Sequence, residues 1–215
     1  MADEAGSRRG RFNEAIPRPR IQTLSDLIFG LALSIGALTL LSDKPSTMIG
    51  LASSLLGFGW AFVILAIVWV RYTRLMSVLP VETGRMIGAN MLLLFLVSVE
   101  PYLYNLITVS FAPLPSQLDS GLTTALYAVD MGSIFLIIAY FTHELTIEER
   151  KLIPRELLRN YRIQRNATIV SSAIFLVSTL PMFWNLVVFG FQLRFILWMC
   201  TFLVWIGRRE VERRS

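Results

Sequence analysis

The chain has 215 residues, of which 54% are hydrophobic and only 16% are charged, and its mean hydropathy is +0.59. Soluble domains carry charge on about a quarter of their residues, so this composition excludes an ordinary soluble fold and is typical of a membrane protein. The formal net charge of +5 comes from arginines that flank the apolar stretches, so it predicts no nucleic-acid partner.

The N-terminal segment 1–20 is polar, rich in arginine and interrupted by Pro17 and Pro19. This composition indicates a disordered basic tail rather than a signal peptide, so we expect the first apolar stretch to remain uncleaved.

The following segment, 21–207, contains apolar stretches of about 20 residues, long enough to cross the hydrocarbon core as helices. The sequence therefore predicts an all-α membrane domain, and then a short cytoplasmic tail over 208–215. The six predicted transmembrane helices are 22–42, 47–70, 86–109, 121–143, 166–187 and 190–207, with Pro181 interrupting the fifth.

Positive charge is distributed very unevenly between the predicted loops. Eighteen of the 20 lysines and arginines lie on one side of the membrane, and only Lys44 and Arg194 fall on the other. The positive-inside rule then predicts a multi-pass protein of the cell membrane with both termini cytoplasmic, which requires an even number of spans. The same arginines are expected to contact anionic membrane lipid.

The longest predicted loop, 144–165, mixes Leu157, Leu158 and Tyr161 with many arginines. This pattern favours a basic amphipathic connector on the inner membrane surface. A passive surface helix and a gating linker both remain open.

The sequence contains no Gly-rich phosphate loop, no nucleophile–base pair and no His–carboxylate metal spacing. No loop is long enough to fold as a catalytic domain. We therefore expect neither enzymatic activity, nor a cofactor, nor a metal site.

The first predicted helix carries an aliphatic ridge. At 100° per residue, Leu31, Ile35 and Leu38 fall within about 60° of one another. Small residues on both sides of this ridge predict that the two flanks of the helix pack closely against neighbouring helices. The ridge itself would then face away from those neighbours. A symmetry axis lined by stacked hydrophobic rings is one candidate, and ordinary core or lipid packing is the alternative. The flanking small-residue stripes are Asp26, Gly30 and Ala37 on one side and Ser25, Ala32 and Gly36 on the other.

Glu100 and Asp130 are the only acids within the later predicted helices, and both lie towards their outer ends. They fit an outer vestibule that concentrates cations ahead of the rings. They equally fit buried carboxyl groups that are protonated or paired with Arg194.

Three segments carry a family resemblance. The run Arg20-Ile21-Gln22-Thr23-Leu24-Ser25-Asp26 resembles the Arg-x-x-x-Phe-Ser-Asp motif of the transmembrane protein 175 (lysosomal potassium channel) family, with Leu24 in place of Phe. The end of the second helix, at Trp69, and the run from Asn90 to Pro101 are also similar to that family.

This resemblance implies a single-repeat, prokaryotic-type potassium-permeable leak channel that assembles as a homotetramer and has no P-loop filter. Potassium would be the permeant ion. The residues implied by the resemblance are Leu31 at the narrowest ring, Ile35 and Leu38 at further rings, and Ser34 as a hydroxyl that tunes selectivity.

Arg20, Ser25 and Asp26 are expected to support the pore helix structurally. Ser25 is expected to cap the start of the helix, and Asp26 to interact favourably with the positive end of the helix dipole. Arg20 is expected either to pair with a carboxylate or a backbone carbonyl, or to act as an ordinary basic anchor at the membrane surface. The alternative function is a small secondary or proton-coupled transporter that uses Glu100 and Asp130, although no internal repeat of the kind common in transporters is visible.

Overall fold

The computed structural model describes residues 20–42, 47–79, 83–110, 120–150, 152–188 and 191–214. The predicted tail, 1–20, lies outside these ranges except for Arg20. The all-α fold predicted from the sequence is confirmed. Within the described residues the long helices are α1 (Arg20–Ser42), α2 (Met48–Met76), α3 (Gly84–Ser110), α4 (Ser120–Leu145), α5 (Arg155–Val177) and α7 (Leu193–Arg214).

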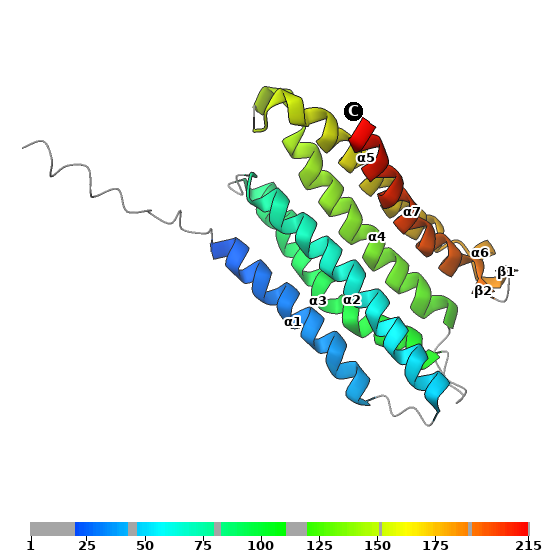
Figure 1. Ribbon diagram of the computed structural model, residues 1–215. Coiled ribbons are helices and arrows are strands. Elements are labelled where there is room, and N and C mark those ends of the chain that lie inside the picture. The colour runs from blue at the N-terminus through cyan, green and yellow to red at the C-terminus, as the bar shows by residue number, and fades with distance from the viewer. Residues whose placement is uncertain are drawn as a thin grey trace, which may run out of the picture.

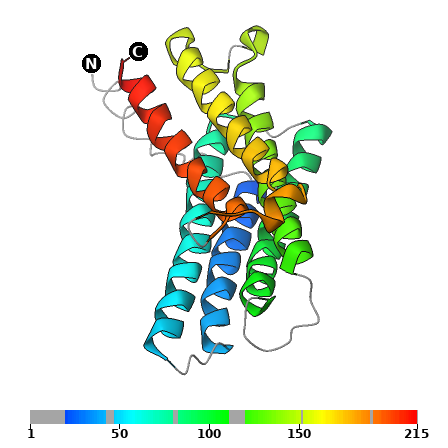
Figure 2. The same cartoon turned by 90° about the vertical axis from the view of Figure 1, so that its right-hand side faces the viewer.

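The helices form an elongated bundle with α4 near its middle (Figure 1). On one side of the bundle, α1 packs against α2 and α3, and on the other, α4 packs against α5, which in turn contacts α7. Figure 2 shows that the start of α5 and the end of α7 lie at the same end of the bundle as the end of α4.

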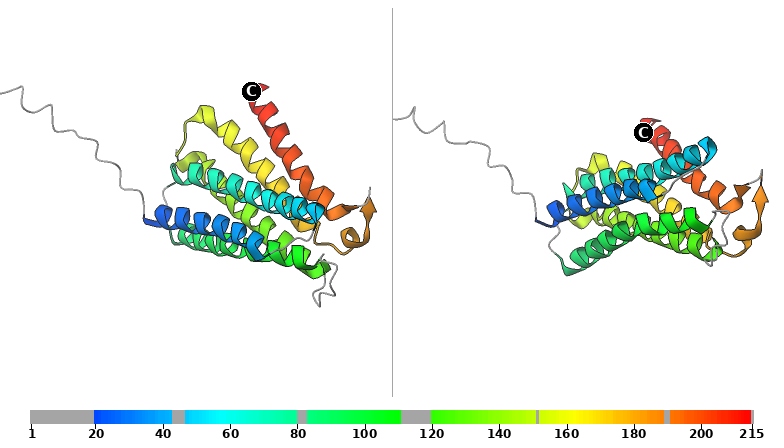
Figure 3. Two further views of the ribbon diagram at one scale, coloured as in Figure 1. Left: turned by 60° about the horizontal axis from the view of Figure 1, so that its bottom comes forward. Right: turned by 90° about the horizontal axis from the view of Figure 1, so that it is seen from below.

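Short elements close the end of the bundle opposite to the start of α1 (Figure 3). They are a one-turn helix, α6 (Met182–Asn185), and an antiparallel pair, β1 (Val187–Val188) and β2 (Phe191–Gln192), with Val188 opposite Phe191. Their position brings the chain back into α7 without a long loop.

Aromatic side chains join α4, α5 and α7. Phe135 of α4 lies 5.7 Å from Phe175 of α5, and Phe175 stacks at 5.5 Å on Trp198 of α7. The indole of Trp198 donates a hydrogen bond of 2.8 Å to the Ser178 hydroxyl. Pairing of the indole N–H is what allows so large an amphipathic ring to be buried at low cost.

The predicted helix boundaries differ from the observed ones mainly in the second half. In the part of the chain that the structure describes, three helical segments, in α2, α3 and α4, are long and apolar enough to cross a membrane, and α1 contains a shorter apolar stretch, Gln22–Leu38. Helix α5 begins at Arg155 rather than at residue 166 and ends at Val177, shortly before Pro181. Likewise α7 continues through 208–214, which had been predicted as a tail.

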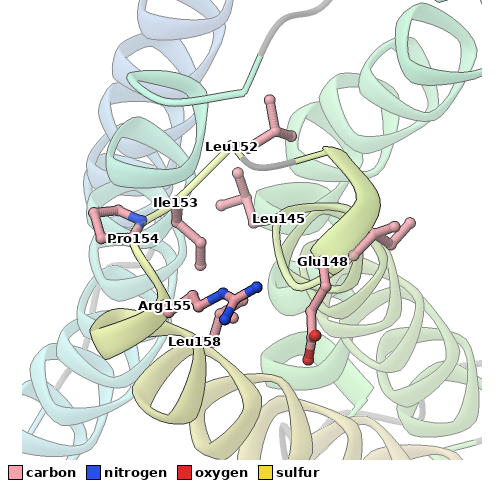
Figure 4. A pocket seen from close by; sticks show the side chains of 8 residues that line it. Leu145, Glu148, Leu152, Ile153, Pro154, Arg155 and Leu158 are labelled. Carbon is pink, nitrogen blue, oxygen red and sulfur yellow. The ribbon is translucent and has the colours of Figure 1, made fainter.

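The stretch 144–165 is therefore not a separate connector helix. Helix α4 ends at Leu145, a 3-10 turn, η1 (Glu148–Arg150), follows, and the chain re-enters a helix just after Pro154. Proline is favourable at the start of a helix because backbone N–H groups there have no hydrogen-bond acceptor within the helix, so the N–H that proline lacks costs no hydrogen bond. Apolar side chains, among them Leu145, Ile153 and Leu158, enclose a cavity of about 270 Å³ in this turn, with Glu148 and Arg155 beside it (Figure 4).

Candidate functional site

Helix α1 has one face buried within the chain. Ser25, Phe29 and Ala32 are at most 1% exposed, and they lie at the spacing of a single helical face. Gly36 extends this face, since a Cβ atom placed there would lie 3.6 Å from the Phe58 ring of α2. The Ser25–Ala32–Gly36 stripe is thus the flank along which α1 packs against the rest of the chain.

Ser25 joins three helices through its side chain. Its hydroxyl accepts a hydrogen bond of 2.6 Å from Tyr72 of α2 and one of 3.5 Å from the amide of Asn90 of α3. The expected helix cap at Ser25 is wrong, because α1 begins at Arg20 and Ser25 lies inside the helix. A buried hydroxyl must find partners, and here it finds them on neighbouring helices.

Asp26 makes the second link from α1 to α2. Its Oδ1 accepts a hydrogen bond of 3.1 Å from the indole of Trp69. Because the first turn of α1 contains no acidic residue, the expected role of Asp26 at the helix dipole is replaced by this contact. The side chain of Arg20 lies outside the described residues. The described part of the motif therefore joins helices to each other, a role that sequence spacing alone did not reveal.

The predicted ridge lies about 120° around α1 from the packed face. Leu31 is 59% exposed, Ile35 39% and Leu38 57%, so the described helices of this chain leave the ridge uncovered. Ser34 is exposed beside them, and its hydroxyl donates a 2.8 Å hydrogen bond to the Gly30 carbonyl one turn earlier. This back-bond satisfies the hydroxyl donor while leaving its oxygen available as an acceptor.

In the second small-residue stripe, Asp26 contacts Trp69 of α2, but Gly30 and Ala37 do not pack within the chain, contrary to expectation. A Cβ atom at Gly30 would meet no described atom within 4 Å, and Ala37 is exposed. Beside the ridge runs a groove of about 250 Å³ between α1 and α3, whose walls include Leu31, Ile35 and Phe95. One flank of α1 is therefore internal, and the ridge with its other flank is open.

Glu100 and Asp130 are enclosed between α3 and α4, at 1% and 4% exposure. The Tyr127 hydroxyl donates a 3.4 Å hydrogen bond to Oε1 of Glu100. Among the described atoms, Oδ2 of Asp130 is buried without a hydrogen-bond partner. Arg194, the expected partner cation, is also buried and donates to the Thr124 hydroxyl and, at 2.8 Å, to Gln192.

The described residues contain no group of three or more His, Cys, Asp or Glu placed to hold a metal ion. Polar residues on α1, α2 and α3 instead join these three helices to one another through side-chain hydrogen bonds. Of the two partner residues, Asn90 had a signal in the sequence, because it places a polar group at the start of an apolar stretch that must bury it. Tyr72 had no such signal, because it lies among Arg71, Thr73 and Arg74.

Residues 20–101 match the family model described as endosomal/lysosomal potassium channel TMEM175. No curated protein sequence matches the chain.

Solved structures share the fold. One is a lysosomal potassium-selective channel TMEM175 homolog from Chamaesiphon minutus, with a TM-score of 0.57 and 19% sequence identity, covering 88% of this chain and 96% of that chain. Another is a variant of the potassium channel MtTMEM175 in complex with a nanobody–MBP fusion protein, with a TM-score of 0.58 and 19% identity, covering 96% of each chain. At this identity the likeness shows a common fold.

The family match spans α1, α2 and most of α3, including the motif around Ser25 and both helices that bind it. The resemblance seen in the sequence is thereby confirmed: residues 20–101 match the TMEM175 family model, and the chain shares its fold with the solved TMEM175 channels.

Proposed function

We propose that this chain forms a potassium-permeable channel in which four copies place α1 around a central axis. The family and both solved relatives are described as potassium channels, which supports ion conduction. The observation that carries the proposal is the two-sided character of α1. Ser25 and Asp26 join α1 to α2, while Leu31 and Leu38 of the ridge are 59% and 57% exposed.

The ridge supplies the constriction in this proposal. At 1.5 Å per residue, the rings of Leu31, Ile35 and Leu38 occupy about 10 Å of the axis. Aliphatic rings of that length expel water from a narrow pore and oppose ion entry until the pore widens. Leu31 forms the narrowest ring, as the family resemblance implies, and the open flank at Gly30 and Ala37 faces the neighbouring copy.

Ser34 tunes ion preference in the same proposal. Its hydroxyl donates to the Gly30 carbonyl, so its oxygen lone pairs are free to coordinate a partly dehydrated cation. Ser25 and Asp26 act indirectly, because their hydrogen bonds set the rotation of α1 that presents Ser34 and the ridge. In this proposal Arg20 supports the pore helix, as the family resemblance implies.

The proposed location is the cell membrane, with both termini cytoplasmic. Support comes from the uneven distribution of the 20 lysines and arginines and from the positive-inside rule. The start of α1 and the end of α7 lie towards the same end of the bundle, as an even number of crossings requires (Figure 1).

The test is potassium flux into liposomes that contain the purified protein, with a sodium gradient as the comparison. Leu31→Asn is expected to raise flux or weaken the preference for potassium, because an amide wets the constriction. Leu136→Asn is the matched control, since Leu136 lies mid-helix in α4 and is 52% exposed. Flux that is unchanged by Leu31→Asn, or changed equally by the control, contradicts the ring at Leu31.

A carrier is the second candidate, because Glu100 and Asp130 form an enclosed acidic pair with Tyr127 beside it. A carrier predicts saturating exchange that is lost in Glu100→Gln and indifferent to Leu31→Asn. A channel predicts flux that rises linearly with driving force. Flux measurements on a single liposome preparation therefore distinguish the channel from the carrier.

A further inference from the structure

A groove runs between α2 and α7 on the outside of the bundle. Its volume is about 430 Å³. Both helices run in the same direction here, and both walls change from apolar to basic along that direction. Apolar residues, including Val63, Ile67, Phe202 and Ile206, line its length, and Arg71, Arg74 and Arg208 gather at its end.

The basic end of the groove is preformed. Arg71 is 8% exposed, and its Nη1 donates a 3.3 Å hydrogen bond to the Thr168 hydroxyl of α5. Its guanidinium carbon lies 4.5 Å from the centre of the Trp205 ring. That indole in turn donates a 3.1 Å hydrogen bond to Ser171. A cation on α2 that is held by contacts from α5 and α7 loses little side-chain freedom when an anion binds, which favours binding.

We propose that this groove binds an anionic phospholipid, with an acyl chain along α2 and α7 and the phosphate among the three arginines. From Val63 to Arg74 the helix rises about 17 Å, close to half of a hydrocarbon core of about 30 Å. One acyl chain of a single leaflet therefore matches the apolar length. This inference does not depend on the proposed channel activity.

Charge decides the class of lipid. Three of the residues that line the groove are arginines, and none of its described lining residues is acidic. Basic pockets between membrane helices on the cytoplasmic side suit phosphate head groups, and a zwitterionic head group gains less from three cations. The arginines place the phosphate at the end of the bundle towards which α2 and α7 run.

The experiment is native mass spectrometry of the purified protein with dioleoyl phosphatidylglycerol or with dioleoyl phosphatidylcholine. These probes share acyl chains and differ in charge. Retention of phosphatidylglycerol is expected to exceed that of phosphatidylcholine, and excess inorganic phosphate is expected to leave it bound, because the acyl chain contributes. Equal retention of both lipids, or displacement by phosphate, would overturn the proposal.

Two variants test the two halves of the groove. Arg74→Gln with Arg208→Gln is expected to weaken phosphatidylglycerol binding roughly 25-fold, at about fivefold for each arginine. Arg85→Gln with Arg159→Gln is the matched control, since both arginines lie outside the groove lining. An equal loss in the control indicates diffuse charge and refutes a specific site.

Ala66→Phe fills the apolar part of the groove and leaves the arginines in place. Ala66→Phe is expected to abolish the preference for phosphatidylglycerol over phosphatidylcholine. Ala52→Phe, on the same helix but outside the groove lining, is expected to leave that preference unchanged. Undiminished binding in Ala66→Phe contradicts an acyl chain in the groove. A changed subunit number in the arginine variants would show that the groove is a contact between copies, which also overturns the proposal.

Discussion

Gly57 leaves the space that the Tyr104 hydroxyl occupies where α2 meets α3. A Cβ atom at Gly57 would lie 2.0 Å from the Tyr104 hydroxyl oxygen and 3.3 Å from its Cζ. Gly57→Ala therefore displaces the ring, at an overpacking cost of about 1–3 kcal/mol in the free energy of unfolding. The better helix propensity of alanine offsets about 1 kcal/mol of that cost. We expect a net loss of about 1 kcal/mol.

Removal of the hydroxyl reverses the sign. In the Tyr104→Phe background, the nearest atom to the new methyl group is Cζ at 3.3 Å, which needs a shift of only a few tenths of an ångström. Gly57→Ala then keeps the propensity gain and becomes neutral or stabilising by up to about 1 kcal/mol. The coupling between the two substitutions is thus about 1–2 kcal/mol, within the range for residues in contact.

The assay is unfolding of the four proteins in mixed micelles by increasing sodium dodecyl sulfate, followed by tryptophan fluorescence. Gly59→Ala is the control on the same helix, because a Cβ there meets no described atom within 4 Å. It should show the propensity gain alone. A Gly57→Ala effect that is the same with and without the Tyr104 hydroxyl would refute the reasoning.

Three further predictions concern the candidate site. Ser25→Ala removes the acceptor shared by two buried donors, so it is expected to lower the free energy of unfolding by about 1–3 kcal/mol in the same assay. A loss no greater than that caused by Tyr72→Phe would contradict a shared acceptor. Trp69→Phe removes the donor to Asp26 and is expected to cost about 1 kcal/mol, and an Asp26→Ala double-mutant cycle without coupling would refute that contact. Leu38→Asn is expected to raise potassium flux in liposomes less than Leu31→Asn, because Leu31 forms the narrower ring; the reverse order would move the constriction.

The ridge on α1 was predictable because helical periodicity places Leu31, Ile35 and Leu38 on one face whatever surrounds the helix. The packing of the flanks was not predictable in the same way. Both stripes of small residues suit close helix contact, and only the fold shows that Ala32 is buried while Gly30 is open. Periodicity defines faces, and the rotation of the helix in the bundle decides which face is covered.

The start of α5 illustrates a second limit. Hydropathy placed the helix at 166 because Arg155, Arg159, Arg162 and Arg165 make the preceding residues polar. Arginine is nevertheless a good helix former, so polarity ends the apolar stretch without ending the helix. The prediction found the apolar part and missed the basic turns that precede it.

By itself, the sequence determined the membrane class, the charge asymmetry and the aliphatic ridge, since these depend on composition and on spacing along the chain. Tertiary structure alone decided the partners of the polar residues. Ser25 meets Tyr72 across 47 positions, and Arg71 meets Thr168 across 97. Such contacts depend on how each helix is rotated and which helices are neighbours, and packing of the whole bundle sets both.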